Sequence, residues 1–325
     1  MARLPDRATP GPLSSAVVKV WIPHPAGVEL LGEVPPGVTV EPWTDPAAPP
    51  SDPSGVRFWV PPFLAAGDAT AMLGRLPDLA VVQLLSAGAD TWTGRVPDGV
   101  TLCDARGVHD AGTAEWVVTA ILAQLRDFPA MVRAQSRGEW AYGDVAPTDE
   151  LTGKRVLIVG AGSIGTAVRA RLAPFDVEFT LVARTARPAE GVHAVDDLSR
   201  LLPAADVVVL LVPLTDATRG MVDERFLAAM PDGALLVNAA RGPVVRTDAL
   251  VAEVSGGRLR AALDVTDPEP LPAEHPLWRL PHVLLTPHVA GSVRGLLPRA
   301  YRLVGEQLRR FTAGEPLANT VVDGY

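Results

Sequence analysis

Three chemically capable side chains follow short apolar runs in the last third of the chain. Arg241 lies in NAARGPVV, Glu269 in ALDVTDPEPL and His288 in LLTPHVAGS. A guanidinium can hold a carboxylate with two parallel hydrogen bonds, and a histidine can exchange a proton near neutral pH. Reduction of a 2-oxo acid needs both groups, because the carboxylate must be held while the carbonyl oxygen is protonated. Each residue alone could be an ordinary loop residue, but the three together indicate a catalytic site.

A glycine-rich turn occupies residues 155–172, RVLIVGAGSIGTAVRARL. Gly160, Gly162 and Gly165 have GxGxxG spacing directly after a predicted buried strand and at the start of a predicted helix. Such glycines allow a tight turn and a close approach of the backbone to a pyrophosphate, which the helix N-terminus at Ser163 and Ile164 would attract. In this setting the motif predicts dinucleotide binding rather than a simple turn.

The strand after this turn ends in LVARTARP and lacks the acidic residue that usually accepts from the adenosine ribose. Ala183 stands there instead, followed by Arg184, Thr185 and Arg187. Two guanidinium groups suit a 2′-phosphate, so the sequence favours NADP(H) over NAD(H). The alternative is that these arginines are solvated surface residues and the site accepts both cofactors.

The elements that must position these residues follow an alternating pattern. The runs VVKVW, RFWV and LAVVQLL alternate with helical segments, and after Gly112 a single long helix is expected over residues 113–135. Six strands follow, at residues 155–160, 178–183, 206–212, 234–238, 260–265 and 283–286, and a last helix within residues 295–316 could return to the first part. The prediction is an α/β protein with two Rossmann-like, doubly wound parallel-sheet domains. The dinucleotide-binding domain, residues 105–293, would be inserted into a discontinuous substrate domain of residues 1–104 and 294–325.

Composition excludes several other classes of protein. The chain has 325 residues and a formal net charge of −8, which disfavours nucleic acid as a partner. The single cysteine, Cys103, excludes an internal disulfide, and no metal-ligand cluster is evident. Residues 1–15 contain no signal-like apolar core and no run is long enough to span a membrane, so we expect a cytoplasmic protein.

Several motifs in the same order resemble those of the D-isomer-specific 2-hydroxyacid dehydrogenases, and most closely an NADP-type glyoxylate/hydroxypyruvate reductase. They are LLSAGAD at 84–90, AEWVV at 114–118, the glycine turn, LLVPLTDATRGMV at 210–222 and the three segments around Arg241, Glu269 and His288. The resemblance covers nearly the whole chain. Thr266 departs from it, because many relatives carry an aromatic residue there.

The resemblance implies a role for each matching residue. Arg241 would bind the substrate carboxylate and carbonyl, and His288 would be the general acid in reduction and the base in oxidation, held in orientation by Glu269. The backbone amides of Ser86, Ala87 and Gly88 would also bind the carboxylate. Further contacts with the dinucleotide are expected from Val212, Pro213, Thr218, Ala239, Asp264 and Gly291.

The resemblance also implies a homodimer formed through the nucleotide domain and the long helix. A second hypothesis is a dinucleotide-sensing regulatory or binding protein on the same fold, although a sensor needs no proton donor. Some polar residues are expected to have no part in the chemistry. We interpret Asp267 as a surface residue, Asp110 and Glu115 as helix caps, and the remaining histidines as structural, namely His24, His109, His193, His275 and His282.

Overall fold

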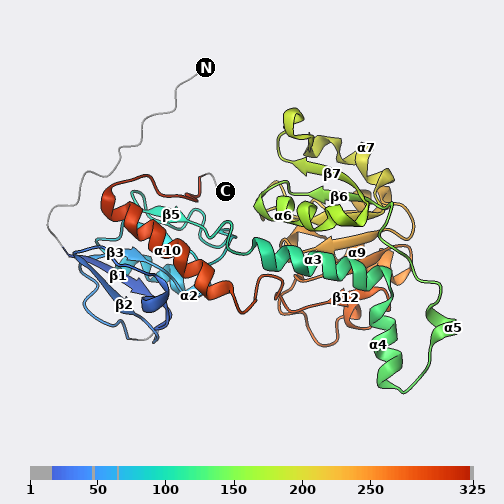
Figure 1. Ribbon diagram of the computed structural model, residues 1–325, viewed down its shortest axis with the longest axis horizontal. Coiled ribbons are helices and arrows are strands. Elements are labelled where there is room, and N and C mark those ends of the chain that lie inside the picture. The colour runs from blue at the N-terminus through green and yellow to red at the C-terminus, as the bar shows by residue number, and fades with distance from the viewer. Residues whose placement is uncertain (1–16, 46–47, 64–65, 323–325) are drawn as a thin grey trace. The chain divides into compact units, whose positions relative to one another are not determined.

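The computed structural model describes residues 17–45, 48–63 and 66–322, so the prediction made for residues 1–15 lies outside it. The chain divides into two compact units (Figure 1). The first unit contains the residues up to His109 and those from Arg294 onward, and the second unit is Asp110–Val293. That the second unit is a dinucleotide-binding domain inserted into a substrate domain stays a prediction.

The first unit is built on a five-stranded parallel sheet with the order β2-β1-β3-β4-β5. Its strands are β1 (Val18–Ile22), β2 (Val38–Pro42), β3 (Val56–Trp59), β4 (Val81–Gln83) and β5 (Thr101–Cys103). Its helices are α1 (Gly27–Leu30), α2 (Ala66–Ala71), the short 3₁₀ turn η1 (Leu73–Arg75) and α10 (Leu296–Ala313). Strands β2 and β5 were not predicted, since β2 ends in a proline and β5 lacks the long apolar run that surrounds the equally short β4.

Alternation along β1 gives the first unit two apolar layers. Val20 and Ile22 pack with Tyr301 and Val304 of α10 on one side of the sheet, whereas Trp21 packs with other tryptophans on the opposite side. This is the period-two pattern of a strand covered on both faces. The last helix thus completes the core of the unit that contains the N-terminal strands.

The second unit is built on a seven-stranded parallel sheet with the order β12-β11-β10-β9-β6-β7-β8. Its strands are β6 (Arg155–Val159), β7 (Glu178–Ala183), β8 (Val192–Ala194), β9 (Val207–Leu210), β10 (Leu235–Asn238), β11 (Arg260–Leu263) and β12 (Val283–Leu285). All six predicted strands are present, and β8 is an additional short edge strand. The chain order reverses between β6 and β9, which is the switch point of a doubly wound sheet. The predicted fold class is therefore confirmed, with two parallel-sheet α/β units.

The helices of the second unit cover both faces of its sheet (Figure 1). They are α3 (Asp110–Leu125), α4 (Phe128–Ser136), α5 (Tyr142–Val145), α6 (Ser163–Leu172), α7 (Leu198–Leu201), α8 (Glu224–Ala229) and α9 (Thr247–Ser255). Short 3₁₀ turns connect them: η2 (Ala173–Phe175), η3 (Pro188–Glu190), η4 (Val195–Asp197), η5 (Leu202–Ala204), η6 (Gly242–Val244) and η7 (Pro276–Trp278). Among the described residues, no helix combines the length and apolar character needed to cross a membrane.

The prediction of one long helix over residues 113–135 is wrong. The helix begins earlier, at Asp110, and ends at Leu125, because Asp127 adopts a left-handed conformation with a φ of 51°. Pro129, at the second position of α4, has no N–H to continue the α3 hydrogen bonds but is well suited to the first turn of a new helix. Helices α4 and α5 belong to a segment that projects away from the sheet of the second unit (Figure 1).

Candidate active site

The predicted functional segments of the second unit all start at one edge of its sheet. Paired residues form a single row across six strands: Val182, Val159, Leu210, Asn238, Leu263 and Leu285. The chain leaves each strand on the same side after this row, since all the strands are parallel. Ligands of doubly wound sheets bind at this edge. The glycine turn and the loops that carry Arg241, Glu269 and His288 therefore share one edge of the second unit.

Glu269 and His288 form a hydrogen-bonded pair. The Nδ1 atom of His288 lies 2.6 Å from Oε1 of Glu269, and the two side chains are 29% and 42% exposed. His288 has a φ of 54°, a left-handed conformation that is uncommon for a residue with a side chain. The carboxylate is thus placed to fix the orientation of the ring, and Nε2 is the ring nitrogen that this contact leaves open.

Asp264 holds the loop that carries His288. Its backbone carbonyl accepts from the N–H of His288 at 2.7 Å. Its Oδ1 atom accepts from the hydroxyl of Thr286 at 2.6 Å and from the N–H of Val289 at 2.8 Å, while Oδ2 accepts from the N–H of Ala290 at 2.9 Å. The residue is buried, so these hydrogen bonds are shielded from water. This arrangement makes Asp264 a residue that positions the His288 loop.

Arg241 lies in the neighbouring loop, after β10. It comes three residues beyond Asn238, just as His288 comes three residues beyond Leu285, and β11 separates the two strands. Two strand spacings place the start of these loops about 10 Å apart. The buried side chain of Asn238 shapes the Arg241 turn, donating to the carbonyl of Arg241 at 3.1 Å and accepting from the N–H of Ala240 at 3.0 Å.

The glycine turn has the geometry expected of a phosphate-binding loop. Gly160 has a φ of 122°, and a Cβ there would lie 2.6 Å from the backbone of Leu211, while a Cβ on Gly165 would overlap the carbonyl of Gly160. The N–H groups of Gly160 and Ala161 both donate to the carbonyl of Val182, which ties the turn to the end of β7. Gly162 caps α6 without any capping side chain. The exposed helix N-terminus and the missing side chains fit a diphosphate group.

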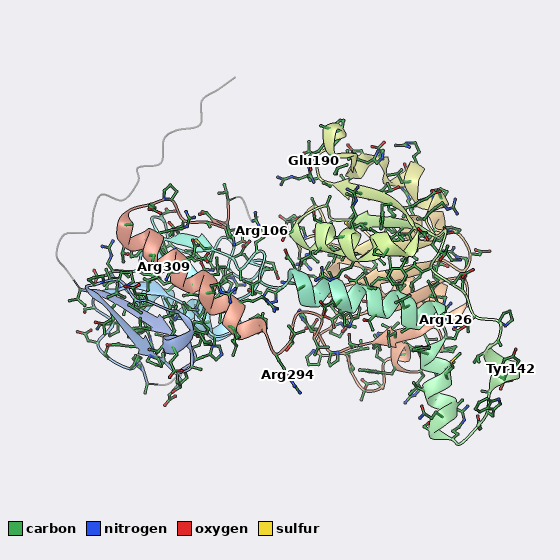
Figure 2. The ribbon with its side chains drawn as sticks, in the orientation of Figure 1. Arg106, Arg126, Tyr142, Glu190, Arg294 and Arg309 are labelled. Atoms are coloured by element: carbon green, nitrogen blue, oxygen red, sulfur yellow. The ribbon has the colours of Figure 1, made fainter. Side chains whose placement is uncertain are left out.

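One hydroxyl contact and one arginine lie beside this turn. The hydroxyl of Ser163 donates to the carboxylate of Asp110, the first residue of α3. The guanidinium of Arg187 donates to the carbonyl of Ala161 at 2.9 Å and to Glu190 at 2.9 Å, and Glu190 is labelled in Figure 2. Arg184 and Thr185, at the end of β7, are exposed. Arg187 is therefore attached to the glycine turn itself, whereas Arg184 is the arginine directed to solvent.

The remaining predicted contacts lie in loops at the same edge. Thr218 closes the loop after β9, because its hydroxyl donates to the carbonyl of Pro213 at 2.5 Å and accepts from the N–H of Thr215 at 2.8 Å. Val212 belongs to this loop, Ala239 follows β10 and Gly291 follows β12. That these residues contact a dinucleotide stays a prediction.

Ser86, Ala87 and Gly88 follow β4 in the first unit, so they come from a different unit than the other site residues. The hydroxyl of Ser86 donates to the carbonyl of Gly88 at 2.8 Å, and its own carbonyl accepts from the N–H of Ala105. These bonds hold the three residues in a compact turn. Their binding of a substrate carboxylate also stays a prediction.

Most residues interpreted as structural have local partners. His24 bonds Tyr301, His109 bonds the carbonyl of Leu85, His193 faces Asp197 and His275 accepts from the N–H of Leu277. Asp267 is exposed, as expected for a surface residue.

The interpretation of Glu115 as a helix cap is wrong. Glu115 is the sixth residue of α3 and faces Arg171 of α6 at 3.5 Å, because the helix starts earlier than expected.

Two other classes of chemistry find no support in the part of the chain that the structure describes. No group of three or more acidic, histidine or cysteine residues could hold a metal ion among these residues. Burial raises the pKa of the Cys103 thiol to about 12, so this thiol stays protonated at neutral pH and is no nucleophile.

Sequence reasoning missed the side chains that support the site, Asn238 and Thr286. Each is a polar residue at the end of a strand that is otherwise apolar, as in ALLVN and VLLT. Such a polar residue needs a hydrogen-bond partner: Asn238 has its partners in the turn that follows its own strand, and Thr286 has Asp264, which follows the neighbouring strand. This was the signal that could have revealed them.

Comparison with known proteins identifies the family. Residues 118–290, more than half of the chain, match the model of the D-isomer specific 2-hydroxyacid dehydrogenase, NAD binding domain. A glyoxylate reductase of Thermofilum pendens is 35% identical over 253 residues, which cover 74% of this chain and 74% of that protein.

Two similar solved structures extend this relationship to both units. A D-isomer specific 2-hydroxyacid dehydrogenase of Xanthobacter autotrophicus Py2, in complex with NADPH and MES, has a TM-score of 0.81 and 31% identity over 95% of this chain and 100% of its own. An NADPH-dependent glyoxylate/hydroxypyruvate reductase of Sinorhizobium meliloti, in complex with NADP and sulfate, has a TM-score of 0.81 and 30% identity with the same coverage. The chain therefore belongs to the D-isomer specific 2-hydroxyacid dehydrogenase family and is an NAD(P)-dependent oxidoreductase.

Proposed function

We propose that this oxidoreductase reduces a small 2-oxo acid, of the size of glyoxylate or hydroxypyruvate, to a 2-hydroxy acid with NADPH. The observation that carries this proposal is the hydrogen-bonded pair of His288 and Glu269, whose Nδ1 and Oε1 atoms lie 2.6 Å apart at the sheet edge that also bears Arg241. Such a pair supplies a proton donor, and the nearby guanidinium supplies a carboxylate-binding fork.

Each of these residues has one task in the proposed reaction. Arg241 binds the substrate carboxylate and polarises the carbonyl. His288 donates the proton from Nε2 to the carbonyl oxygen, and Glu269 at Nδ1 stabilises the charged ring before the transfer. A bound NADPH would supply the hydride. The backbone amides of the turn at Ser86, Ala87 and Gly88 are also proposed to bind a substrate carboxylate, which would make the first unit the substrate domain and the second unit the dinucleotide domain.

The test of this function uses a panel of 2-oxo acids with NADPH and with NADH, followed through the absorbance of the reduced nicotinamide. We expect turnover of glyoxylate or hydroxypyruvate and none of the corresponding amides, because the amides lack the anionic group that Arg241 binds. Tight dinucleotide binding with no turnover of any acid would contradict the proposal and favour a sensor.

The preference for NADP(H) rests on Ala183, Arg184 and Arg187. The exposed side chain of Arg184 binds the 2′-phosphate, whereas Arg187 also stabilises the glycine turn through the carbonyl of Ala161. Arg184→Ala should therefore raise the KM for NADPH about tenfold or more and leave that for NADH nearly unchanged. Arg187→Ala should weaken both cofactors. An equal effect of Arg184→Ala on NADPH and NADH would remove the basis for the preference.

A homodimer is also proposed, and an exposed apolar arm supports it. The arm consists of residues 126–148 of the second unit, and its two ends meet where the N–H of Asp149 donates to the carbonyl of Leu125. Along it Phe128, Val132, Trp140 and Tyr142 are 55%, 61%, 95% and 73% exposed, and Tyr142 lies on the projecting part in Figure 2. Apolar side chains gathered on one segment indicate a protein interface.

Sedimentation measurements test the dimer. Trp140→Glu should shift the protein toward the mass of a monomer. The control, Val322→Glu, changes an apolar side chain of the first unit that is 52% exposed and should leave the mass unchanged. A wild-type chain that sediments as a monomer would contradict the proposal.

A cytoplasmic location is also proposed. The buried free thiol of Cys103 agrees with it, because thiols stay reduced in that compartment.

A further inference from the structure

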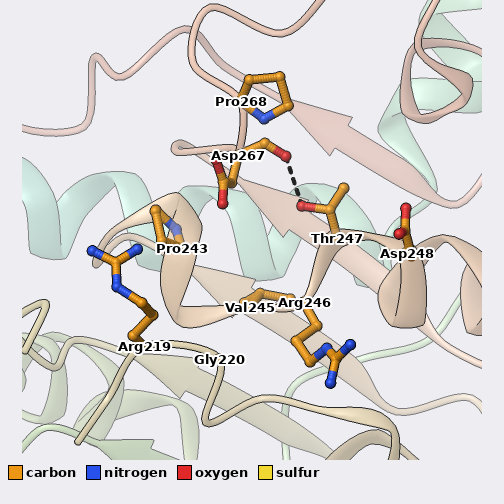
Figure 3. A pocket seen from close by; sticks show the side chains of 9 residues that line it. All are labelled: Arg219, Gly220, Pro243, Val245, Arg246, Thr247, Asp248, Asp267 and Pro268. Atoms are coloured by element: carbon orange, nitrogen blue, oxygen red, sulfur yellow. Dashed lines mark hydrogen bonds between the residues drawn. The ribbon is translucent and has the colours of Figure 1, made fainter. Parts of the chain in front are cut away.

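A pocket of about 450 Å³ in the second unit is lined by residues of two loops of the candidate site, and these loops contact each other (Figure 3). The hydroxyl of Thr247, the first residue of α9, donates to the backbone carbonyl of Asp267 at 2.7 Å, which Figure 3 shows as a dashed line. Thr247 follows Arg241 by six residues, and Asp267 precedes Glu269 by two. This hydrogen bond therefore connects the loop of Arg241 with the loop of Glu269.

A glycine brings the same two loops into backbone contact. Gly242 follows Arg241, and a Cβ there would overlap the carbonyl group of Thr266 and lie 2.8 Å from the backbone nitrogen of Asp267. These neighbours are backbone atoms, which cannot rotate away as a flexible side chain would. The absent side chain allows the close approach, but it supplies no attraction. The hydrogen bond from Thr247 supplies the attraction.

The Glu269 loop depends on few such contacts. Residues 267–270 are exposed, and Pro268 and Pro270 have no N–H to donate. The hydroxyl of Thr266 bonds the carbonyl of Pro268 at 2.9 Å, but this bond stays within the loop. Within the described part of the chain, hydrogen bonds connect the segment to other loops through Thr247 and through the pair of Glu269 and His288. A carboxylate that is 42% exposed can turn to water when its backbone shifts.

We propose that Thr247 is a positioning residue, which together with Gly242 holds the Glu269 loop so that this carboxylate reaches Nδ1 of His288. Its hydroxyl acts through the backbone carbonyl of Asp267. The inference rests on the proposed roles of Glu269 and His288. The Thr247 hydrogen bond fixes the position of the Glu269 loop relative to the Arg241 loop. The proton donor and the carboxylate-binding group then keep one relative position.

The experiment compares Thr247→Val, which removes the hydroxyl at constant shape, with Thr247→Ser, which restores it. Thr312→Val is the matched control, since the Thr312 hydroxyl also bonds a backbone carbonyl, that of Leu308, but on α10 in the first unit. Thr247→Val should lower kcat/KM for the 2-oxo acid about three- to tenfold, the effect of one lost hydrogen bond. The Kd for NADPH should stay within about twofold, and Thr247→Ser should recover most of the loss.

Two further measurements separate positioning from a general structural effect. In the background of Glu269→Gln, Thr247→Val should cause little further loss, because the carboxylate that it positions is already gone. The pH profile of Thr247→Val should move in the same direction as that of Glu269→Gln. An equal loss from Thr247→Val in both backgrounds overturns the proposal.

Hydrogen exchange tests the contact without any assay of turnover. Amides of residues 264–271 should exchange faster in Thr247→Val than in the wild type. In Thr312→Val their exchange rates should equal those of the wild type. Unchanged exchange in Thr247→Val overturns the proposal even if the enzyme is active. A wild-type protein that reduces no 2-oxo acid would instead refute the proposed function, while the exchange experiment still reports on the contact.

Discussion

Asp264→Asn is the substitution whose effect the structure defines most sharply. It replaces one carboxylate oxygen by an amino group and keeps the size of the side chain. If the amide oxygen keeps the place of Oδ1, which accepts from Thr286 and Val289, the amino group faces the N–H of Ala290. Two donors then face each other in a buried site. The variant loses at least one hydrogen bond to a charged group and leaves a buried donor without an acceptor.

The magnitude follows from these two losses. A hydrogen bond to a charged group and an unsatisfied buried donor together cost about 2–4 kcal/mol. In a unit of the size of Asp110–Val293 each kcal/mol lowers the melting temperature by roughly 2–4 °C, so we expect a decrease of about 5–15 °C. The displaced His288 loop should lower kcat about ten- to hundredfold, because misplacement of a catalytic group is costly.

Calorimetry and steady-state kinetics test this prediction together. Asp267→Asn serves as the control, since Asp267 lies in the neighbouring loop but is exposed. It should leave the melting temperature and kcat nearly unchanged. If Asp264→Asn matched the wild type in both measurements, the carboxylate would not be what holds the His288 loop, and our interpretation of Asp264 would be refuted.

Three further outcomes can be stated. His288→Gln should lower kcat by about 10²–10⁴ with little change in KM, and unchanged turnover would remove His288 from the mechanism. Arg241→Lys keeps the charge but loses the planar fork, so kcat/KM for the acid should fall about ten- to hundredfold in steady-state assays; near-normal kinetics would mean that the carboxylate binds elsewhere. The hydrogen bond from the Arg155 side chain holds the pKa of Asp206 below its usual value. This ion pair therefore stabilises the fold fully above the unfolded-state pKa of about 3.9, and the stabilisation is lost as the pH falls through the lower folded-state pKa. Asp206→Asn should therefore reduce the unfolding free energy at neutral pH by about 1 kcal/mol in urea titrations, and a gap that persisted in strong acid would contradict this account.

The sequence predicted the parts of the fold that carry strong periodic signals. The strands of the second unit are nearly continuous apolar runs, such as VVVL in β9, and parallel strands buried on both faces have this composition. The break at Asp127 was missed because the apolar spacing continues across it, although Pro129 signals a new helix start. Strands β5 and β8 have the short, mixed sequences TLC and VHA, whereas the equally short β4 lies within the longer apolar run LAVVQLL, which made β4 predictable.

Some residues of the site could be predicted from the sequence, and others could not. Arg241, Glu269 and His288 stood out because their chemistry and their places after strands are visible in the sequence. The side chain of Asn238 bonds backbone groups of the Arg241 turn, and the hydroxyl of Thr286 bonds the carboxylate of Asp264. The partners of such bonds appear only when the chain is folded. The role of Arg187 in the glycine turn was hidden for the same reason, since Ala161 lies far from it in the chain.

The place of α10 in the core of the first unit has a consequence for the order of folding during synthesis. The second unit is complete once Val293 has been made, whereas the first unit still lacks the apolar side chains of Tyr301, Val304 and Leu308. Domains generally fold as they emerge from the ribosome. The second unit should therefore be able to reach a protease-resistant state before α10 has emerged, whereas the N-terminal strands should stay sensitive to protease until α10 packs on them.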